Sequence, residues 1–217
     1  MKLFKKMVGV FIGMFILGIG VAFNKAAALG QDPLASFIFS FVYLCDEKIP
    51  YSMWYIIINF IFFIFMFISL RNRIHFGTIA GLIFIGIFSD MFYAVFVALN
   101  MIPKAIVVRF IFTILGIIIS CFGIAFYGSA NLGLGPYDAI AVLVSRSLKK
   151  VKFKCIRIIL DTTCALFAFL ISNVYLKRTD IVNINTVLAF CFAGPLISFF
   201  SKIVVKIYYK EEFNDFN

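Results

Sequence analysis

Apolar positions along this chain form long runs that short polar stretches interrupt. Six of the runs are long enough to cross a hydrocarbon core about 30 Å thick, which takes roughly 20 helical residues. They cover about 7–28, 51–70, 75–97, 107–128, 155–176 and 183–206. The pattern predicts an all-α polytopic bundle of about six spanning helices, which forms a single transmembrane domain over residues 1–217.

Two further apolar pieces, 33–45 and 136–148, are too short to cross as helices, and we expect them to lie at an interface or to dip in and return. Each follows a break in which glycine allows unusual dihedrals and proline suits the first helical position. Asp32 stands where an acid would cap the first short helix. The residues of the two breaks are Gly30, Pro33, Gly133, Gly135 and Pro136.

The two halves of the chain resemble each other. Residues 13–36 align with 116–139 without a gap and share nine identities in 24 positions, the break residues among them. More faintly, 77–86 matches 185–194 through Thr78 with Thr186 and Gly86 with Gly194, and Asn59 falls near Asp161. Residues 1–28 also resemble a signal peptide. Their place in the repeat favours a retained first helix instead.

Each repeat unit holds three crossings and one short piece. The units cover about 7–98 and 107–207, before a short cytoplasmic tail at 208–217. Because three is odd, the two copies must run in opposite senses through the bilayer, an architecture common among secondary transporters. A Gly-x-x-Pro break between helices is more often a simple turn than part of a substrate path, so both interpretations stay open.

Composition and charge agree with a membrane protein. Hydrophobic residues make up 64% of the chain and charged residues 14%, well away from the averages of soluble domains. With a cytoplasmic N-terminus, the inside segments hold fourteen Lys and Arg and the outside segments six, as expected of cytoplasmic loops. This placement explains the net charge of +10 without nucleic acid and puts both termini on the cytoplasmic side.

Acids in apolar surroundings are candidates for a substrate or ion path, because a carboxylate on a spanning helix is costly and usually functional. Asp90 lies deepest in an apolar run. Asp161 stands four residues after Arg157, so that a structural ion pair is the competing interpretation. Asp138 follows Pro136 closely and could serve only a helix N-terminus. The full set of path candidates is Asp90, Asn59, Asp161, Asp138 and Asn131.

Conventional catalytic signals are missing from the sequence. His75 is the single histidine, and the five cysteines show no C-x-x-C spacing, so that we expect no metal site. A phosphate-binding G-x-x-x-x-G-K-[ST] motif is absent. We therefore expect no catalytic residues, no cofactor and no enzyme activity.

Two stretches carry a resemblance to a known family: "GIAFYGSANLGLGPYDAIAVLVSRSL" at 123–148 and "NTVLAFCFAGPLI" at 185–197. They resemble the bacterial YczE/YyaS/YitT group of integral membrane proteins, although Asn185 stands where that group usually has glycine. The resemblance implies a multi-spanning protein of the bacterial inner membrane that is commonly suspected to be a transporter. The matching positions are Ala130, Leu132, Gly133, Pro136, Tyr137, Asp138, Thr186, Val187, Gly194 and Pro195.

Two functional hypotheses follow. In the first, the protein is a permease for an unidentified small solute: Asp90, Asn59 and Asp161 line a midplane site, and the two breaks act as gates or as helix-dipole donors. In the second, it is a non-transporting membrane subunit, either a regulatory scaffold or a substrate-capture component, with the basic segment 146–157 as its docking face. Both place it in the lipid bilayer, and both are compatible with a homo-oligomer or a partner membrane protein. A membrane enzyme is a distant third.

Overall fold

The computed structural model describes residues 2–69, 75–133, 135–137, 140, 144 and 153–209. Every regular element within these residues is helical, which confirms the predicted all-α fold. Two of the helices continue into π-helical ends, labelled η. The elements are α1 (Lys2–Ala27), α2 (Pro33–Leu44), α3 (Tyr51–Ser69), α4 (Phe76–Ala98), α5 (Ile106–Gly128), α7 (Phe153–Phe169), η2 (Leu170–Tyr175), α8 (Ile184–Val204) and η3 (Val205–Tyr209).

Six helices are long and apolar enough to cross a membrane, as predicted. They cover Leu3–Ala27, Tyr51–Ile68, Phe76–Ala98, Ile106–Gly128, Ile156–Tyr175 and Ile184–Tyr209. The first short piece forms α2, which is apolar and too short to span. Of the second short piece, residues 136, 137, 140 and 144 are helical, and its other residues lie outside the described part of the chain.

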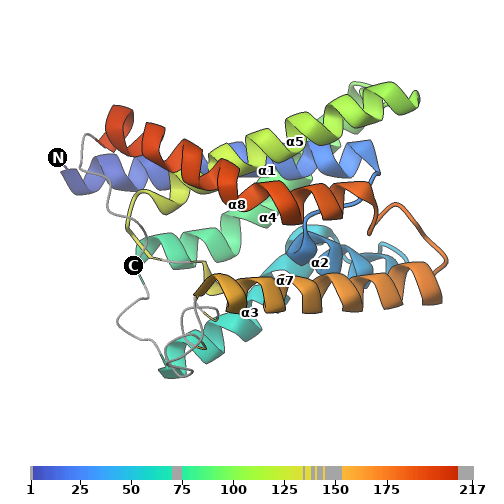
Figure 1. The fold of residues 1–217 in the computed structure, drawn as a ribbon, viewed down its shortest axis with the longest axis horizontal. Coiled ribbons are helices and arrows are strands. Elements are labelled where there is room, and N and C mark those ends of the chain that lie inside the picture. The colour runs from blue at the N-terminus through green and yellow to red at the C-terminus, as the bar shows by residue number, and fades with distance from the viewer. Residues whose placement is uncertain are drawn as a thin grey trace.

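Successive spanning helices run in opposite directions along the long axis of the molecule (Figure 1). α1 starts at the end marked N, α4 and α7 run the same way, and α3, α5 and α8 run back toward that end. Lys2 and Tyr209, the first and last described residues, therefore lie at the same end of the bundle. α1 and α5 are opposed in direction, as are α3 and α7, and α4 and α8.

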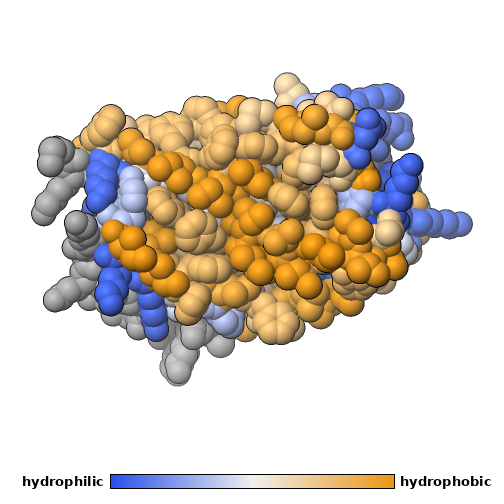
Figure 2. All heavy atoms as spheres, turned by 90° about the horizontal axis from the view of Figure 1, so that it is seen from above, coloured by the Kyte–Doolittle hydropathy of each residue, from blue (hydrophilic) through white to orange (hydrophobic). Residues whose placement is uncertain are grey.

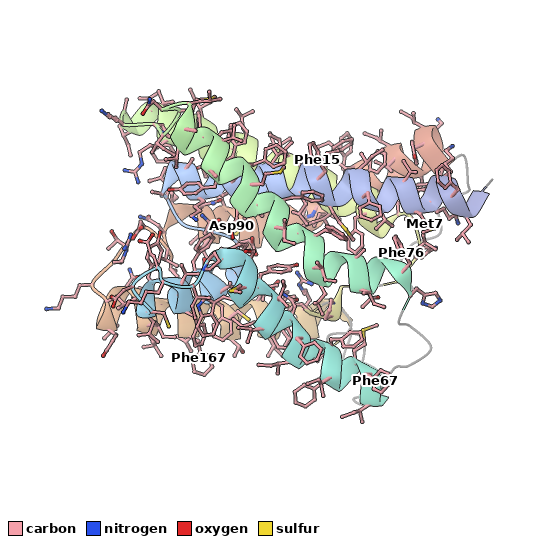
Figure 3. The ribbon with its side chains drawn as sticks, turned by 180° about the vertical axis from the view of Figure 1, so that it is seen from behind. Met7, Phe15, Phe67, Phe76, Asp90 and Phe167 are labelled. Carbon is pink, nitrogen blue, oxygen red and sulfur yellow. The ribbon has the colours of Figure 1, made fainter. Side chains whose placement is uncertain are left out.

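The outer surface is apolar along the middle of the bundle and hydrophilic at both ends (Figure 2). Lipid-facing side chains explain this belt, since a spanning bundle has apolar solvent around it. The spans of α7 and α8 are the least covered, with 17% of each buried inside the protein. Phe67 and Phe167 point outward from this belt (Figure 3) and are 46% and 52% exposed.

Glycines let α1 and α5 approach each other closely. A β-carbon at Gly20 would lie 2.9 Å from the carbonyl oxygen of Gly116, and one at Gly123 would lie 2.8 Å from that of Gly13. Small residues at such positions are typical of tightly packed membrane helices. The alignment of the two halves pairs Gly13 with Gly116 and Gly20 with Gly123. Each of the two contacts therefore joins one glycine position of the first half to the other glycine position of the second.

On its other side α1 packs against α4 through aromatic rings. The ring of Phe15 lies 5.5 Å from that of Phe88 and 4.8 Å from that of Phe92, both edge-on, which is a favourable geometry. Gly18 makes room for this packing, because a β-carbon there would lie 2.5 Å from the Phe88 side chain. α1 therefore packs between α5 and α4 near the centre of the bundle.

Replacing Gly123 by alanine is expected to destabilise the bundle. The new methyl group would lie 2.5 Å from the backbone nitrogen of Leu17, so α1 and α5 must move apart. Overpacking of this kind costs about 1–3 kcal/mol. We expect a lower Tm for Gly123→Ala in a thermal unfolding experiment on purified protein in detergent.

Gly194→Ala is the matched control. A β-carbon at Gly194 in α8 would meet nothing within 4 Å. Because alanine favours a helix interior over glycine by up to about 1 kcal/mol, this variant should keep or raise the Tm. Equal losses of Tm in the two variants would contradict the glycine-mediated contact.

Candidate functional site

Two loops with the same backbone conformation follow α1 and α5. After α1, Ala28 and Gly30 have φ angles of 49° and 100°, and after α5, Asn131 and Gly133 have φ angles of 55° and 112°. All four lie in the left-handed region that favours glycine. Asn131 is exposed and serves this turn. The loops thus share a conformation as well as the Leu-Gly sequence.

The loop after α1 is hydrogen-bonded to the segment that leads into α8. The backbone N–H of Asn185 donates to the carbonyl of Leu29 (2.9 Å), and its side-chain Nδ2 donates to the carbonyl of Gly30 (2.7 Å). The N–H groups of Gly30 and Gln31 donate to the carbonyls of residues 180 and 181, at 3.0 Å each. We call these bonds the first docking contact.

The loop after α5 is hydrogen-bonded to the start of α4. The N–H of Gly77 donates to the carbonyl of Leu132 (2.8 Å), and the hydroxyl of Tyr127 donates to the carbonyl of Gly77 (3.3 Å). Gly133 lies against Thr78, since a β-carbon on this glycine would be 2.4 Å from the threonine hydroxyl. We call this arrangement the second docking contact.

The two docking contacts use equivalent positions of the two halves. The sequence alignment that pairs Thr78 with Thr186 also pairs Gly77 with Asn185, and these two residues donate to the equivalent leucines. Gly30 faces Thr186 as Gly133 faces Thr78. In Figure 1 the first contact lies at the end where α8 begins, and the second lies at the opposite end, where α4 begins.

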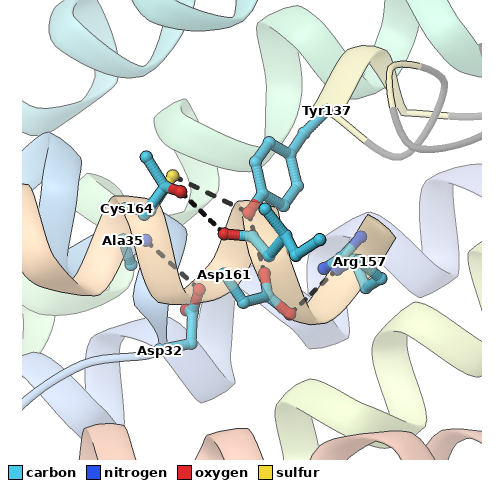
Figure 4. Close-up of polar contacts among 8 residues, drawn as sticks. Asp32, Ala35, Tyr137, Arg157, Asp161 and Cys164 are labelled. Carbon is cyan, nitrogen blue, oxygen red and sulfur yellow. Dashed lines mark hydrogen bonds and ion pairs between the residues drawn. The ribbon is translucent and has the colours of Figure 1, made fainter. Parts of the chain in front are cut away.

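A polar cluster joins the second short apolar piece to α7 (Figure 4). The Tyr137 hydroxyl donates to Oδ1 of Asp161 (2.8 Å) and lies 3.7 Å from Sγ of Cys164. Nε of Arg157 donates to Oδ2 of Asp161 (3.1 Å), which is the ion pair that the spacing suggested. The Arg157 guanidinium also lies 4.6 Å from the centre of the Tyr137 ring.

Asp32 lies beside this cluster, at the start of α2 (Figure 4). Its carboxylate accepts a hydrogen bond from the N–H of Ala35 (3.2 Å), which confirms the predicted cap. Burial raises the pKa of Asp32 above its ordinary value; the charge of Asp161 adds to this, while the Ala35 N–H and Arg157 oppose it. The sequence suggested only the cap, because the neighbours of Asp32 on α7 come from a distant part of the chain.

Asp90 belongs to a different group (Figure 3). Its Oδ2 accepts a hydrogen bond from the N–H of Ser52 (2.7 Å), and Nζ of Lys25 lies 4.0 Å from its Oδ1. The same ammonium group lies 3.9 Å from the centre of the Tyr93 ring. Asp90 thus links α4 to the start of α3 and the end of α1, a structural role that spacing along the chain could not reveal. Its place on a solute path stays a prediction.

The remaining path candidates are dispersed. Asn59 is 1% exposed, and its side chain donates to the carbonyl of Tyr55 one turn earlier in α3 (3.0 Å). Asp138 lies outside the described residues. Of the four candidates that the structure describes, Asp161 is therefore the one that belongs to the polar cluster with Tyr137 and Arg157.

A small cavity lies near the first docking contact. Its volume of about 10 Å³ suits a single water molecule. Arg178 lies at the same end of the bundle. Its Nη2 donates a hydrogen bond to Oδ2 of Asp180 (2.9 Å), and its guanidinium lies 3.7 Å from the centre of the Tyr43 ring. Burial raises the pKa of Tyr43 to about 12. The cavity is lined by Lys25, Ala28, Gln31, Phe39, Tyr43, Asp180 and Ile181.

Metal-ligating side chains do not gather in the part of the chain that the structure describes. No group of three or more His, Cys, Asp or Glu residues could hold a metal ion there. Cys45, Cys121, Cys164 and Cys191 are free thiols.

Comparison with known proteins gives two bacterial relatives. An uncharacterized membrane protein, YczE of Bacillus subtilis, is 30% identical over 136 residues, which is 62% of this chain and 60% of the relative. An uncharacterized protein of Haemophilus influenzae is 28% identical over 138 residues, 64% of this chain and 58% of the relative. The matches thus span less than two thirds of these relatives. No solved structure matches the chain.

A protein family matches far more of the sequence. Residues 4–202 match the family described as "Family of unknown function (DUF6198)". Since this covers most of the 217 residues, the chain belongs to that family, and the resemblance to YczE-like membrane proteins expected from its motifs is confirmed.

Proposed function

We propose that this protein is a secondary transporter of the bacterial inner membrane that carries a small solute and catalyses no covalent chemistry. Its halves, about 7–98 and 107–207, form an inverted repeat, and both termini are cytoplasmic. The end of the bundle that holds the N-terminus is then the cytoplasmic end. This orientation rests on the excess of Lys and Arg in the segments at that end.

The reciprocity of the two docking contacts is the observation that carries the proposal. Asn185 of the second half donates to Leu29 of the first, and Gly77 of the first half donates to Leu132 of the second. Two similar contacts at opposite ends of a bundle give the protein two equivalent places to open. Repeats of opposite sense that exchange conformations are the basis of alternating access in many transporters.

Both docking contacts are formed in the described conformation. The polar cluster of Tyr137, Asp161 and Arg157 is close to both in sequence, since Tyr137 follows Gly133 by four residues and its neighbour Asp32 follows Gly30 by two. Opening the first contact would expose the cluster toward the outer side, and opening the second would expose it toward the cytoplasm. Asp32 directly precedes the first short piece, and Tyr137 belongs to the second. Asp161 and Arg157 come from α7. These four residues are our candidates for the solute site.

The energies involved are compatible with such a cycle. A hydrogen bond contributes about 0.5–1.5 kcal/mol net, so the few bonds of one docking contact amount to several kcal/mol at most. Conformations that differ by a few kcal/mol interconvert with minor populations of about 0.1–10%. Each contact is thus strong enough to hold one end closed and weak enough to open.

Weakening one docking contact should open only its own end. With Cys164 as the single remaining cysteine, we expect slow reaction with a membrane-impermeant maleimide, because its side chain is 8% exposed. Gly77→Ala places a β-carbon 2.8 Å from the Leu132 carbonyl oxygen and should speed labelling from the cytoplasmic side. Asn185→Gly removes the bond to Gly30 and should speed labelling from the outer side. The loss of one bond corresponds to an increase of about 2- to 10-fold.

Right-side-out and inside-out vesicles separate the two directions of labelling. Gly194→Ala is the control, since its side chain would touch nothing within 4 Å. If both variants speed labelling from the same side, or if neither changes it, the gating scheme is wrong.

Locking the first contact should stop transport. Ser36 Oγ and Thr186 Oγ1 lie 3.5 Å apart, so cysteines at these two positions should form a disulfide that joins α2 to α8. Proteoliposomes bathed in a bacterial metabolite extract, analysed by mass spectrometry, should accumulate a solute with the reduced protein and not with the oxidised protein. Reduction should restore uptake, and each single cysteine variant should transport under both conditions.

The same assay distinguishes the second hypothesis. A non-transporting subunit would accumulate nothing alone and would support uptake only with a co-purifying ATPase. The segment 146–157, predicted as its docking face, lies mainly outside the described residues.

A further inference from the structure

Asp32, Asp90 and Asp161 are three carboxylates of the described chain, and Asp32 differs from the other two because no ion pair joins it to a described side chain. Asp90 has Lys25 at 4.0 Å, and Asp161 has Arg157 at 3.1 Å. Asp32 receives backbone hydrogen bonds from α2, but no Lys or Arg nitrogen among the described residues lies within 4.0 Å of it. A partly buried carboxylate in this position is costly to keep charged.

The groups that face Asp32 do little to offset the negative charge of its carboxylate. Those on α3 and α5 are neutral at neutral pH, and α7 contributes one negative and one positive group. Desolvation and a like charge both favour the protonated form of a carboxyl. The titratable and charged groups within electrostatic range of Asp32 are Tyr51 and Tyr55 on α3, Cys121 on α5, and Arg157, Asp161 and Cys164 on α7.

Asp32 is also mechanically connected to the first docking contact. Gly30 and Gln31, which precede it, donate backbone bonds to the segment before α8. Ser36, one turn after it, donates from its hydroxyl to the carbonyl of Ile181 (3.0 Å). A change in how Asp32 caps α2 therefore acts directly on the loop that closes this end. The cap bond is charge-assisted only while the carboxylate is ionised.

We propose that Asp32 binds and releases the proton that couples solute movement to the proton gradient. The inference rests on the proposed function. When the first docking contact opens, a proton from water at that side forms an O–H bond with a carboxylate oxygen of Asp32, and the carboxyl becomes neutral. When the second contact opens instead, this O–H bond breaks and the proton passes to water on the cytoplasmic side. No other atom changes its bonding.

Infrared spectroscopy of the purified protein tests the site without a solute. As the pH falls, the wild type should gain a protonated-carboxyl C=O band at a pH above the ordinary range of aspartate, and Asp32→Asn should lack it. Asparagine caps helices about as well as aspartate, so that variant should fold. Asp46→Asn is the matched control, because the Asp46 side chain is 84% exposed, and it should keep the band. Asp32→Ser offers a second capping variant if the asparagine variant is unstable.

The pH dependence of stability gives a second readout. Because burial raises the pKa of Asp32 in the folded protein, the native state holds this proton at higher pH than the unfolded chain does. Its stability relative to Asp32→Asn should therefore rise as the pH falls through that raised pKa and be lost above it.

Four outcomes separate this inference from the proposed function. A band that persists in both Asp32 variants would overturn it, and so would a Tm that rises with sodium at constant pH and does not respond to protons. If the band is lost in Asp32→Asn but the wild type accumulates no solute, the proton site stands and the proposed transport function is contradicted. Solute uptake that does not change with pH or in Asp32→Asn would support the transporter and contradict the proton site.

Discussion

The structure depends on how the backbone groups at its two breaks are satisfied. A helix end that is buried against other helices leaves carbonyl groups without partners, and lipid supplies no hydrogen bonds. The carbonyls of Leu29 and Leu132 each accept a bond from the first turn of a helix in the opposite half of the chain. At the end of α1, Arg109 adds a bond to the carbonyl of Ala27 (2.6 Å). The backbone groups at these breaks are therefore satisfied by partners from the other part of the chain.

The same constraint links packing to the proposed cycle. α1 and α5 approach closely through glycines and run in opposite directions. The loop after α1 then reaches the start of α8, and the loop after α5 reaches the start of α4. Asp32, which precedes α2, lies within electrostatic range of α7, and Tyr137 of the second short piece donates a hydrogen bond to it. A bundle held by many apolar contacts and closed at each end by a few hydrogen bonds is stable as a whole and easy to open locally.

Much of the fold could be predicted from the sequence, because it depends on local properties. Hydropathy located the six spans, and the Asp-Pro pair identified the cap and start of α2. The spacing of Arg157 and Asp161 on one helix also predicted their ion pair. The partners of Asp90 could not be predicted in this way, since Lys25 and Ser52 lie on other helices. Neighbours across helices depend on rotation and register, which a single sequence does not specify.

Distances between spin labels at the two ends test the central claim most directly. One pair, at Lys48 before α3 and Lys104 before α5, reports the end where α3 and α5 begin, and another, at His75 before α4 and Lys202 near the end of α8, reports the end that holds the N-terminus. Alternating access predicts that each pair shows a short and a long population, and that a pH change which favours the long distance in one pair favours the short distance in the other. A single distance in both pairs under all conditions, or ends that lengthen together, would contradict the account.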